Sequence, residues 1–199
     1  MIKFITIEKQ AEAEEIIERS RFIAHIKRTD TREEADLFIA EIKRQYKDAT
    51  HNVPAFVIGE KQDIQWASDD GEPSGTSGAP MLQMLVKEGL TNVTVVVTRY
   101  FGGIKLGTGG LVRAYTGVLR LALEKAGRFE VREVKSIKVK LPYSLLTKLQ
   151  KSAEDLKYSM DDIEYSDELL VTLSFEPEDE ERIISWFTDI TQGKLVISE

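Results

Sequence analysis

Five of the 13 glycines in this 199-residue chain fall between residues 102 and 110, directly after an apolar, β-branched run at residues 93–97. Glycine loses more backbone entropy on folding than any other residue, so this density requires unusual dihedral angles or a close approach of the backbone. Residues 98–115 read T-R-Y-F-G-G-I-K-L-G-T-G-G-L-V-R-A-Y and continue into an apolar helical pattern. The stretch therefore predicts a buried strand, a glycine-rich loop and a helix in succession.

Cationic side chains are interleaved with these glycines, and no acid interrupts them before Glu124. A helix N-terminus and glycine-rich backbone offer N–H groups to anions. Arginine adds a bidentate fork for phosphate, and lysine adds a mobile point charge. Arg113 lies in the first turn of the predicted helix, where a cation opposes the helix dipole, and this favours an anion nearby. The predicted anion-binding residues are Arg99, Tyr100, Gly102, Gly103, Lys105, Gly107, Gly109, Gly110 and Arg113.

The loop also carries a geometric prediction. At least two of its glycines should adopt positive φ, because nothing else explains so many between a buried strand and a helix. The N–H groups of Gly109 and Gly110 should point outward at the start of the helix and leave an anion-sized recess. Arg99 should reach that recess from the strand end, and Lys105 from the loop.

Neither common phosphate-binding fingerprint fits the loop. Gly102 and Gly107 have the spacing of a P-loop, but Thr108 stands where the phosphate-binding lysine belongs. Gly107 and Gly109 begin a dinucleotide fingerprint, but Val112 replaces its third glycine. The alternative is a tight turn that packs a helix against a sheet, which explains the glycines but not the cations.

A second unusual segment, residues 68–80, reads S-D-D-G-E-P-S-G-T-S-G-A-P before another apolar helical pattern. Its acids Asp69, Asp70 and Glu72, with His51 upstream, could assemble a general-base or hard-metal cluster. The alternatives are solvated acids in a surface loop and a neutral histidine bonded to backbone, and no metal is expected. An ion pair with Asp69 or Asp70 is likewise an alternative to anion binding for Arg99.

These two segments, with D-A-T-H-N at residues 48–52 and S-R-F-I-A at residues 20–24, resemble the YigZ/YvyE–IMPACT family. The resemblance covers about residues 20–125, and the remainder is similar to the smaller C-terminal domain of bacterial members. It implies an N-terminal domain of the ribosomal-protein and elongation factor G domain IV superfamily, followed by a ferredoxin-like domain that is similar to one in elongation factor G.

The functional implications of the resemblance are general. Eukaryotic IMPACT members are translation regulators that bind Gcn1 through a region including an extra N-terminal domain. We do not expect the Gcn1 contact here, because the sequence has no room for that domain. The resemblance brings no settled enzymatic activity, and its superfamily includes both ribosome-binding domains and small-molecule kinases, so the fold cannot choose between binding and catalysis.

Composition excludes several classes of protein. Without cysteine the chain has no disulfides, thiolate metal sites or cysteine catalysis. It shows no signal peptide and no apolar run of membrane-spanning length, so we expect a soluble, cytoplasmic protein without a membrane partner. The net charge of the chain is −7. Residues 99–128 are nevertheless basic, with six Lys and Arg and a single acid, Glu124. Residues 132–199 are acidic, with 9 Lys and Arg and 15 Asp and Glu. This distribution predicts a cationic patch on an otherwise acidic protein.

Hydrophobic periodicity predicts an α+β chain of two domains, residues 1–130 and 131–199, joined directly by a strand near 128–133. In the first domain strands are expected at Ile2–Ile7, 15–27, 53–58, Ile64–Ala67 and 93–98, and helices at 31–47, 79–88 and 110–125. The second domain has the order βαββαβ, typical of the ferredoxin-like arrangement. Its strands are expected at 134–141, Tyr158–Tyr165, 168–175 and 194–197, with one helix carrying Leu145, Leu146, Leu149 and Leu156 and another at 177–189.

Functions from different classes remain open. We favour a protein that binds RNA, the ribosome or another phosphate-rich partner and acts in translation-related regulation. A translation-related protein is a further expected partner. We expect neither a cofactor nor specificity for DNA. The alternative is an enzyme acting on a phosphorylated small molecule or nucleotide at the same loop, with unknown catalytic residues. A closed pocket lined by both loops would favour the enzyme, and an open basic face would favour binding. A third interpretation makes the acidic C-terminal domain a protein-docking module.

Overall fold

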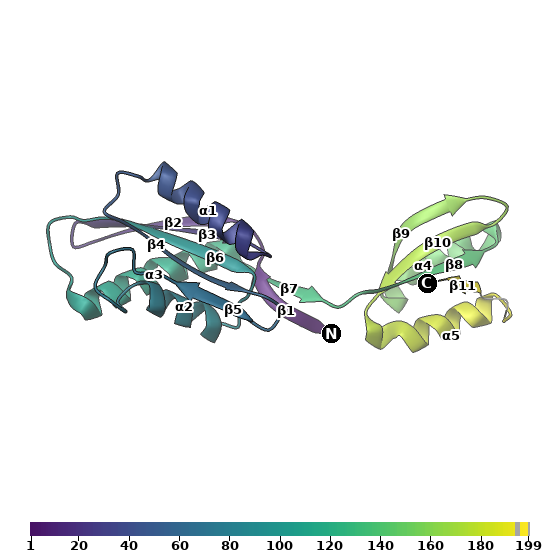
Figure 1. Ribbon diagram of the computed structural model, residues 1–199. Coiled ribbons are helices and arrows are strands. Elements are labelled where there is room, and N and C mark those ends of the chain that lie inside the picture. Colours follow the sequence, from purple (N-terminus) through teal and green to yellow (C-terminus); the bar gives the residue numbers. More distant parts are fainter. Residues whose placement is uncertain (194–195, 199) are drawn as a thin grey trace. The chain divides into compact units, whose positions relative to one another are not determined.

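The computed structural model describes residues 1–193 and 196–198. The chain divides into two compact units. The larger comprises Lys3–Val131, and the smaller joins Met1–Ile2 to the described residues from Arg132 onward. Each has its own apolar core, and Figure 1 shows the elements of both. In the described part of the chain, no helix is both long enough and apolar enough to cross a membrane.

The larger unit contains three helices and seven strands among its described residues. In chain order they are β1 (Ile2–Ile7), β2 (Ala11–Ile17), β3 (Ser20–Arg28), α1 (Arg32–Gln45), β4 (His51–Ile58), β5 (Ile64–Ala67), α2 (Gly78–Lys87), β6 (Val93–Tyr100), α3 (Gly107–Ala126) and β7 (Arg128–Arg132). The capping residue Thr31 accepts a hydrogen bond from the Glu34 N–H at 3.2 Å, as a helix start there requires. The strand predicted near residues 128–133 is β7, which pairs with β1.

A five-stranded antiparallel sheet forms the centre of this unit, in the order β2-β3-β6-β4-β5. Side chains of the central strand β6 alternate between the two faces. Val93, Val95 and Val97 pack in the core with α2 and α3, whereas Val96 packs in a separate cluster with α1. Helix α1 therefore covers one face of the sheet, and α2 and α3 cover the other (Figure 1).

The single strand predicted at residues 15–27 is wrong, because the structure has two strands there, β2 and β3. Ile17 pairs with Ser20, so only Glu18 and Arg19 form the turn of the hairpin. Both adopt positive φ, at 45° and 64°. A two-residue hairpin turn needs positive φ, and it is usually formed by Asn-Gly or Asp-Gly in the sequence. Glu-Arg carries no such signal, so the turn was not visible in the sequence.

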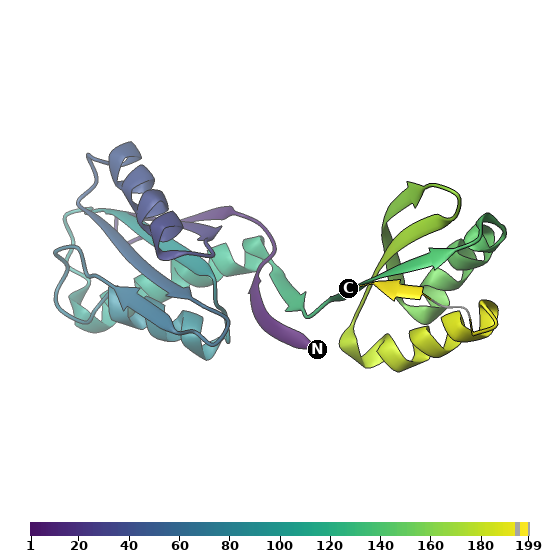
Figure 2. The ribbon, with the colours of Figure 1, turned by 45° about the vertical axis from the view of Figure 1, so that its right-hand side comes forward.

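The smaller unit has the ferredoxin-like arrangement that its βαββαβ order predicts. Its elements are β8 (Lys135–Leu141), a 3₁₀ turn at Tyr143–Leu145, α4 (Leu146–Leu156), β9 (Tyr158–Tyr165), β10 (Leu169–Phe175), a 3₁₀ turn at Pro177–Asp179, α5 (Glu180–Ile190) and β11 (Val196–Ser198). The sheet order is β11-β8-β10-β9, and α4 and α5 share one core with it (Figure 2). Part of the strand predicted at 194–197 lies outside the described residues, because 194 and 195 are not described.

Candidate functional site

The two loops singled out in the sequence meet at a buried ion pair. Arg99 Nη1 lies 2.6 Å from Glu72 Oε1, and the two side chains are 6% and 3% exposed. The Tyr115 hydroxyl donates to the same oxygen at 2.8 Å. Burial, followed by the charge of Glu72, raises the pKa of Tyr115 far above its usual range. The ion pair considered for Arg99 is therefore made with Glu72, and not with Asp69 or Asp70.

The strand pleat explains why Arg99 is buried. It follows Val97 on the face of β6 that α2 and α3 cover, so its side chain enters the core side of the sheet. Its guanidinium carbon lies 5.3 Å from the ring centroid of Phe22 and 5.4 Å from that of Phe101. A charge in such surroundings requires a partner, which Glu72 supplies. Tyr100 points to the opposite face and donates to Asp48 Oδ1 at 3.1 Å.

His51 and Asp70 form a second set of contacts beside the ion pair. His51 Nδ1 lies 2.8 Å from the backbone oxygen of Asp70, and its Nε2 lies 3.8 Å from Glu72 Oε2. The Asp70 carboxylate instead accepts from Lys43 Nζ at 2.6 Å and from the Asn52 N–H at 2.7 Å. His51 is thus bonded to backbone, and Asp70 joins the loop to α1 and β4.

Asp69 occupies the turn before α2. Its carboxylate accepts from the Gly75 N–H at 2.7 Å, the Ser77 hydroxyl at 2.7 Å and the Gly78 N–H at 2.9 Å. Burial acts to raise the pKa of Asp69, but these hydrogen bonds outweigh it and hold the pKa below its ordinary value of 3.8. Each of the three acids therefore has separate partners. Among the described residues, no three His, Cys, Asp or Glu side chains are grouped as metal ligands would be.

We expect Asp69→Asn to destabilise the protein by about 1–3 kcal/mol at neutral pH, because an amide nitrogen would face backbone donors. The native pKa of Asp69 is depressed, so its contribution is fully present above the unfolded-state pKa and is lost as pH falls through the folded-state pKa. Urea denaturation of both proteins between pH 3 and pH 7 measures this. The stability difference should shrink in acid, and a difference independent of pH would contradict the assigned role.

The glycine loop has the predicted positive φ angles at two positions. Gly103 and Gly107 adopt positive φ, at 87° and 68°, as at least two of the five glycines were expected to do. A Cβ on Gly102 would instead overlap the backbone of Arg19 in the β2–β3 turn. The predicted helix start at residue 110 is three residues late, since α3 begins at Gly107 and residues 109 and 110 are helical. The helix starts early because glycine at positive φ turns the chain directly into it.

The start of α3 carries cations and no acid. Its N-cap residue, Leu106, has no side-chain acceptor, and the first turn contains no Asp or Glu. Lys105 precedes the helix. The placement of Arg113 in the first turn is wrong, because α3 starts at Gly107 and Arg113 is its seventh residue. Its side chain reaches back toward the helix start, with Nη1 3.6 Å from where a Cβ of Gly109 would stand. Neither cation forms an ion pair or hydrogen bond with any residue that the structure describes. Two positive groups thus lie beside the positive end of a helix dipole, an arrangement that an anion would stabilise.

Both loops line one cavity of about 380 Å³. Its lining residues are Glu72, Pro73, Arg99, Phe101, Lys105, Leu106, Gly107, Thr108 and Leu111. Phe101, the aromatic residue directly after the central strand β6, is 46% exposed. The apolar wall of Pro73, Leu106 and Leu111 was not predicted from the sequence. The available signal was the four-residue spacing of Leu111 and Tyr115, which puts both on the helix face toward the sheet.

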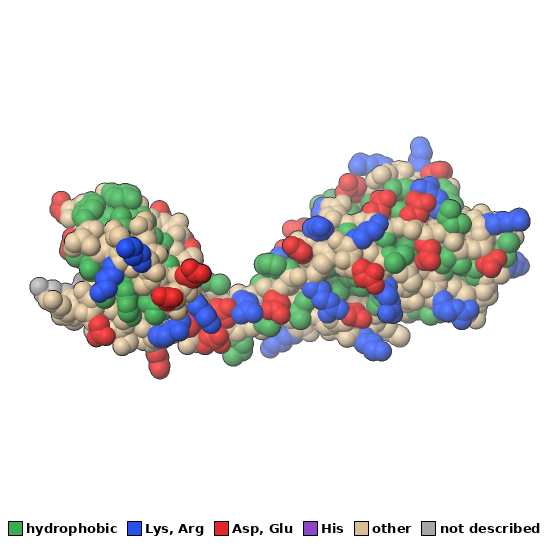
Figure 3. Space-filling view, turned by 180° about the vertical axis from the view of Figure 1, so that it is seen from behind, with side chains coloured by type: hydrophobic (Ala, Val, Ile, Leu, Met, Phe, Trp, Pro, Cys, Tyr) green, Lys and Arg blue, Asp and Glu red, His purple; other side chains and the backbone are tan. Residues whose placement is uncertain are grey.

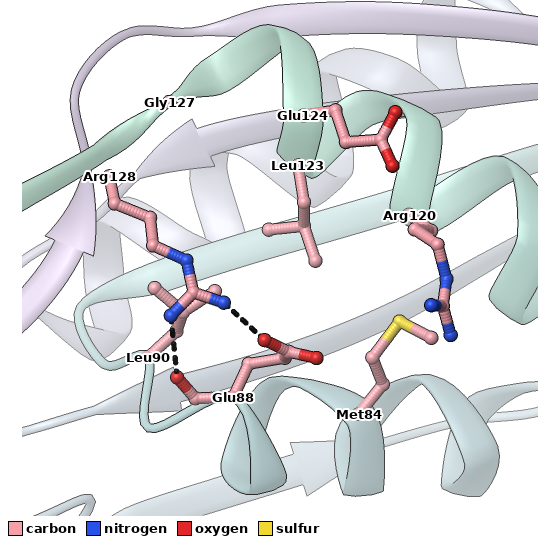
Figure 4. A pocket seen from close by; sticks show the side chains of 8 residues that line it. All are labelled: Met84, Glu88, Leu90, Arg120, Leu123, Glu124, Gly127 and Arg128. Carbon is pink, nitrogen blue, oxygen red and sulfur yellow. Dashed lines mark hydrogen bonds and ion pairs between the residues drawn. The ribbon is translucent and has the colours of Figure 1, made fainter.

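The basic segment at residues 99–128 does not form the single cationic patch that was expected. Arg99 is buried, Lys125 donates to the Glu12 backbone oxygen at 3.1 Å, and Arg128 pairs with Glu88. Figure 4 shows that pair, with Arg120 beside Met84, in a separate cavity of about 330 Å³. On the face of the larger unit shown in Figure 3, basic and acidic side chains are interspersed. Because α3 is long, its cations are spread along the helix.

The comparisons with known proteins agree with the two units. Residues 18–123 match the model of the Impact N-terminal domain, and residues 139–194 match a domain of unknown function, DUF1949. The chain is 41% identical to the IMPACT family member YvyE of Bacillus subtilis over 196 residues, covering 98% of this chain and 90% of that protein.

More distant similarity extends to animals. The mouse Protein IMPACT is 37% identical over 94 residues, which cover 45% of this chain and 29% of the mouse protein. A crystal structure of a hypothetical protein superposes with a TM-score of 0.64 at 30% identity, covering 99% of this chain and 97% of that one. From the match to the Impact N-terminal domain and the identity to YvyE along nearly the whole chain, this protein belongs to the IMPACT family.

Proposed function

We propose that this protein binds RNA, free or in the ribosome, through phosphate contacts at the start of α3, and that it acts in translation-related regulation. The observation that carries the proposal is the pair of unpartnered cations, Lys105 and Arg113, beside an acid-free helix N-terminus. The regulatory part rests on membership of the IMPACT family, whose eukaryotic members regulate translation. A translation-related protein is a further partner under this proposal.

Arg99 contributes indirectly under this proposal. Its charge is matched by Glu72, and its Nη2 also lies 3.3 Å from Ser20 Oγ. Arg99 therefore holds the two loops together, while Lys105 and Arg113 contact phosphate. Substituting Arg99 would be a poor test of binding, because it would leave Glu72 buried without its partner.

The double variant Lys105→Ala/Arg113→Ala tests the proposal. We expect its affinity for RNA and ribosomes to fall at least about tenfold at low salt, with a shallower salt dependence, because each lost phosphate contact removes about 0.7–0.9 from the log–log slope. Sedimentation with ribosomes and fluorescence anisotropy with labelled RNA, both across a salt series, provide the measurement. Arg44→Ala/Lys61→Ala removes the same charge from exposed positions away from the loop and should change little.

Two results would overturn the proposal. One is an unaltered protein that binds neither RNA nor ribosomes at low salt. The other is equal loss in both double variants, since that would reflect net charge and not the loop.

The cavity supports a second candidate function, an enzyme acting on a phosphorylated small molecule, because residues of both loops line it. Catalysis would require a free carboxylate or a metal site. The carboxylates nearest the cavity are already engaged: Glu72 with Arg99 and Tyr115, and Asp69 with backbone N–H groups. A cavity lined by both loops meets the condition stated above for an enzyme, and the basic side chains are dispersed. The engagement of the carboxylates nevertheless argues against acid–base or metal-assisted catalysis, and for this reason we place binding first. Turnover of phosphorylated substrates that is abolished by Glu72→Gln would favour the enzyme instead.

A further inference from the structure

The cavity between the two loops combines apolar walls, a polar floor and adjacent cations. We propose that it receives one unpaired nucleotide of single-stranded RNA, with the base inside the cavity and a phosphate at the start of α3. This inference rests on the proposed function and specifies which part of an RNA reaches the site.

The walls suit a flat, partly apolar group. Phe101 is 46% exposed although it borders the cavity, and Pro73, Leu106 and Leu111 supply the remaining apolar surface. An aromatic ring that is left accessible beside cations is the usual platform for a nucleobase, since every base has a stacking face. A volume of about 380 Å³ is within the range of small-ligand pockets. It admits a single base but not a base pair within a duplex.

The stacking platform is held firmly from behind. The Phe101 N–H donates to Thr50 Oγ1 at 3.0 Å, and the Gly102 N–H donates to Ser20 Oγ at 3.2 Å. The guanidinium of Arg99 lies 5.4 Å from the Phe101 centroid. The backbone that carries the ring is fixed by these hydrogen bonds, so it loses little freedom when a ligand stacks on the ring, and such preorganisation raises affinity.

The floor contains polar groups that are not saturated within the described chain. Arg99, only 5% exposed, has its Nε buried without a hydrogen-bond partner among the described residues. Glu72 Oε2 has only the 3.8 Å approach of His51 Nε2. Arg99 Nε itself is enclosed by protein, but Glu72 and Arg99 both line the cavity. Charged groups in a cavity floor need polar partners, so this floor suits a ligand with donors and acceptors of its own. A base edge has both, whereas a purely apolar ligand has neither.

Lys105 lies at the wall of the cavity where a phosphate would be needed, whereas Arg113 lines a second cavity that also contains Lys105, Glu15 and Glu18. Lys105, Gly107 and Thr108 line the first of these cavities, and the last two belong to the first turn of the 20-residue helix α3. Phe101 and the start of α3 therefore line the same cavity, so one nucleotide can place its base against Phe101 and its phosphate at the helix start. One nucleotide uses the apolar, polar and cationic parts of the site together.

The test compares a labelled single-stranded RNA decamer with a blunt-ended RNA duplex of the same sequence, by fluorescence anisotropy. The unaltered protein should bind the decamer more tightly. Phe101→Ala should weaken decamer binding about tenfold, as expected for loss of one stacked base, without changing the salt slope, because no charge is removed. Phe101→Tyr should retain the affinity. Phe129→Ala is the matched control, because Phe129 is 49% exposed in the same unit but does not line the cavity.

A second measurement uses the unaltered protein and so does not depend on how Phe101→Ala folds. Addition of millimolar AMP should shift the NMR signals of the Phe101 ring and the Leu111 methyl groups, and inorganic phosphate alone should not. The inference would be overturned, and the proposed function left intact, by three results together. Lys105→Ala/Arg113→Ala would lose RNA binding, Phe101→Ala would bind RNA normally, and AMP would shift no signal. Absence of RNA binding by the unaltered protein at low salt would remove both.

Discussion

Replacing Glu72 with alanine is expected to lower the free energy of unfolding by about 3–5 kcal/mol, the range for removing one partner of a buried ion pair. Arg99 would keep its charge at 5% exposure without a carboxylate, and the Tyr115 hydroxyl would lose its acceptor. Urea denaturation followed by circular dichroism measures the change. We expect a lower midpoint at an unchanged slope.

The matched controls separate charge from packing. Glu72→Gln keeps the size and one acceptor, so it should cost less than Glu72→Ala. The double variant Glu72→Leu/Arg99→Met replaces the whole pair with apolar groups and should recover much of the loss, because no unpaired charge remains. If Glu72→Ala cost less than about 1 kcal/mol, Arg99 would have to reach solvent in the folded protein, and the pair would not hold the two loops together.

Gly102→Ala is expected to be the most damaging change in the glycine loop. A Cβ there would overlap the backbone of Arg19 in the β2–β3 turn, and backbone atoms cannot move aside as a flexible side chain can. The hairpin and the loop would have to separate, which also breaks the hydrogen bond from the Gly102 N–H to Ser20 Oγ. We expect a loss of about 2–4 kcal/mol, typical of overpacking combined with the loss of a partly buried hydrogen bond.

Gly109→Ala is the control for this prediction. Gly109 lies in the first turn of α3, its φ is not positive, and its added Cβ would come no closer than 3.6 Å to the mobile end of Arg113. The exchange should therefore be neutral, or stabilise the helix by up to about 1 kcal/mol. Thermal unfolding of both variants makes the comparison. Similar losses in the two would show that the loop tolerates no side chain anywhere, and would remove the special role given to Gly102.

Local patterns determined most of the elements. The β-branched run in β6 indicated a buried central strand, and Thr31 with Glu34 marked the start of α1. The alternation in β8 and the order of the following elements predicted the ferredoxin-like unit. Two of the five loop glycines have the predicted positive φ. These features were readable because periodicity and capping act between residues that are close in the sequence.

Tertiary structure decided how the loops are used. Asp69, Asp70 and Glu72 lie within four residues, and the path of the loop decides which of them pairs with Arg99. The structure shows that this partner is Glu72. The exposure of Phe101 and the dispersal of the basic segment along α3 likewise follow from packing. The cavity itself exists because Pro73, from the loop before α2, and Leu111, from α3, both lie at its wall. Contacts between residues so far apart in the chain leave no periodic trace in the sequence, so residue types alone predicted the chemistry of the site but not its geometry.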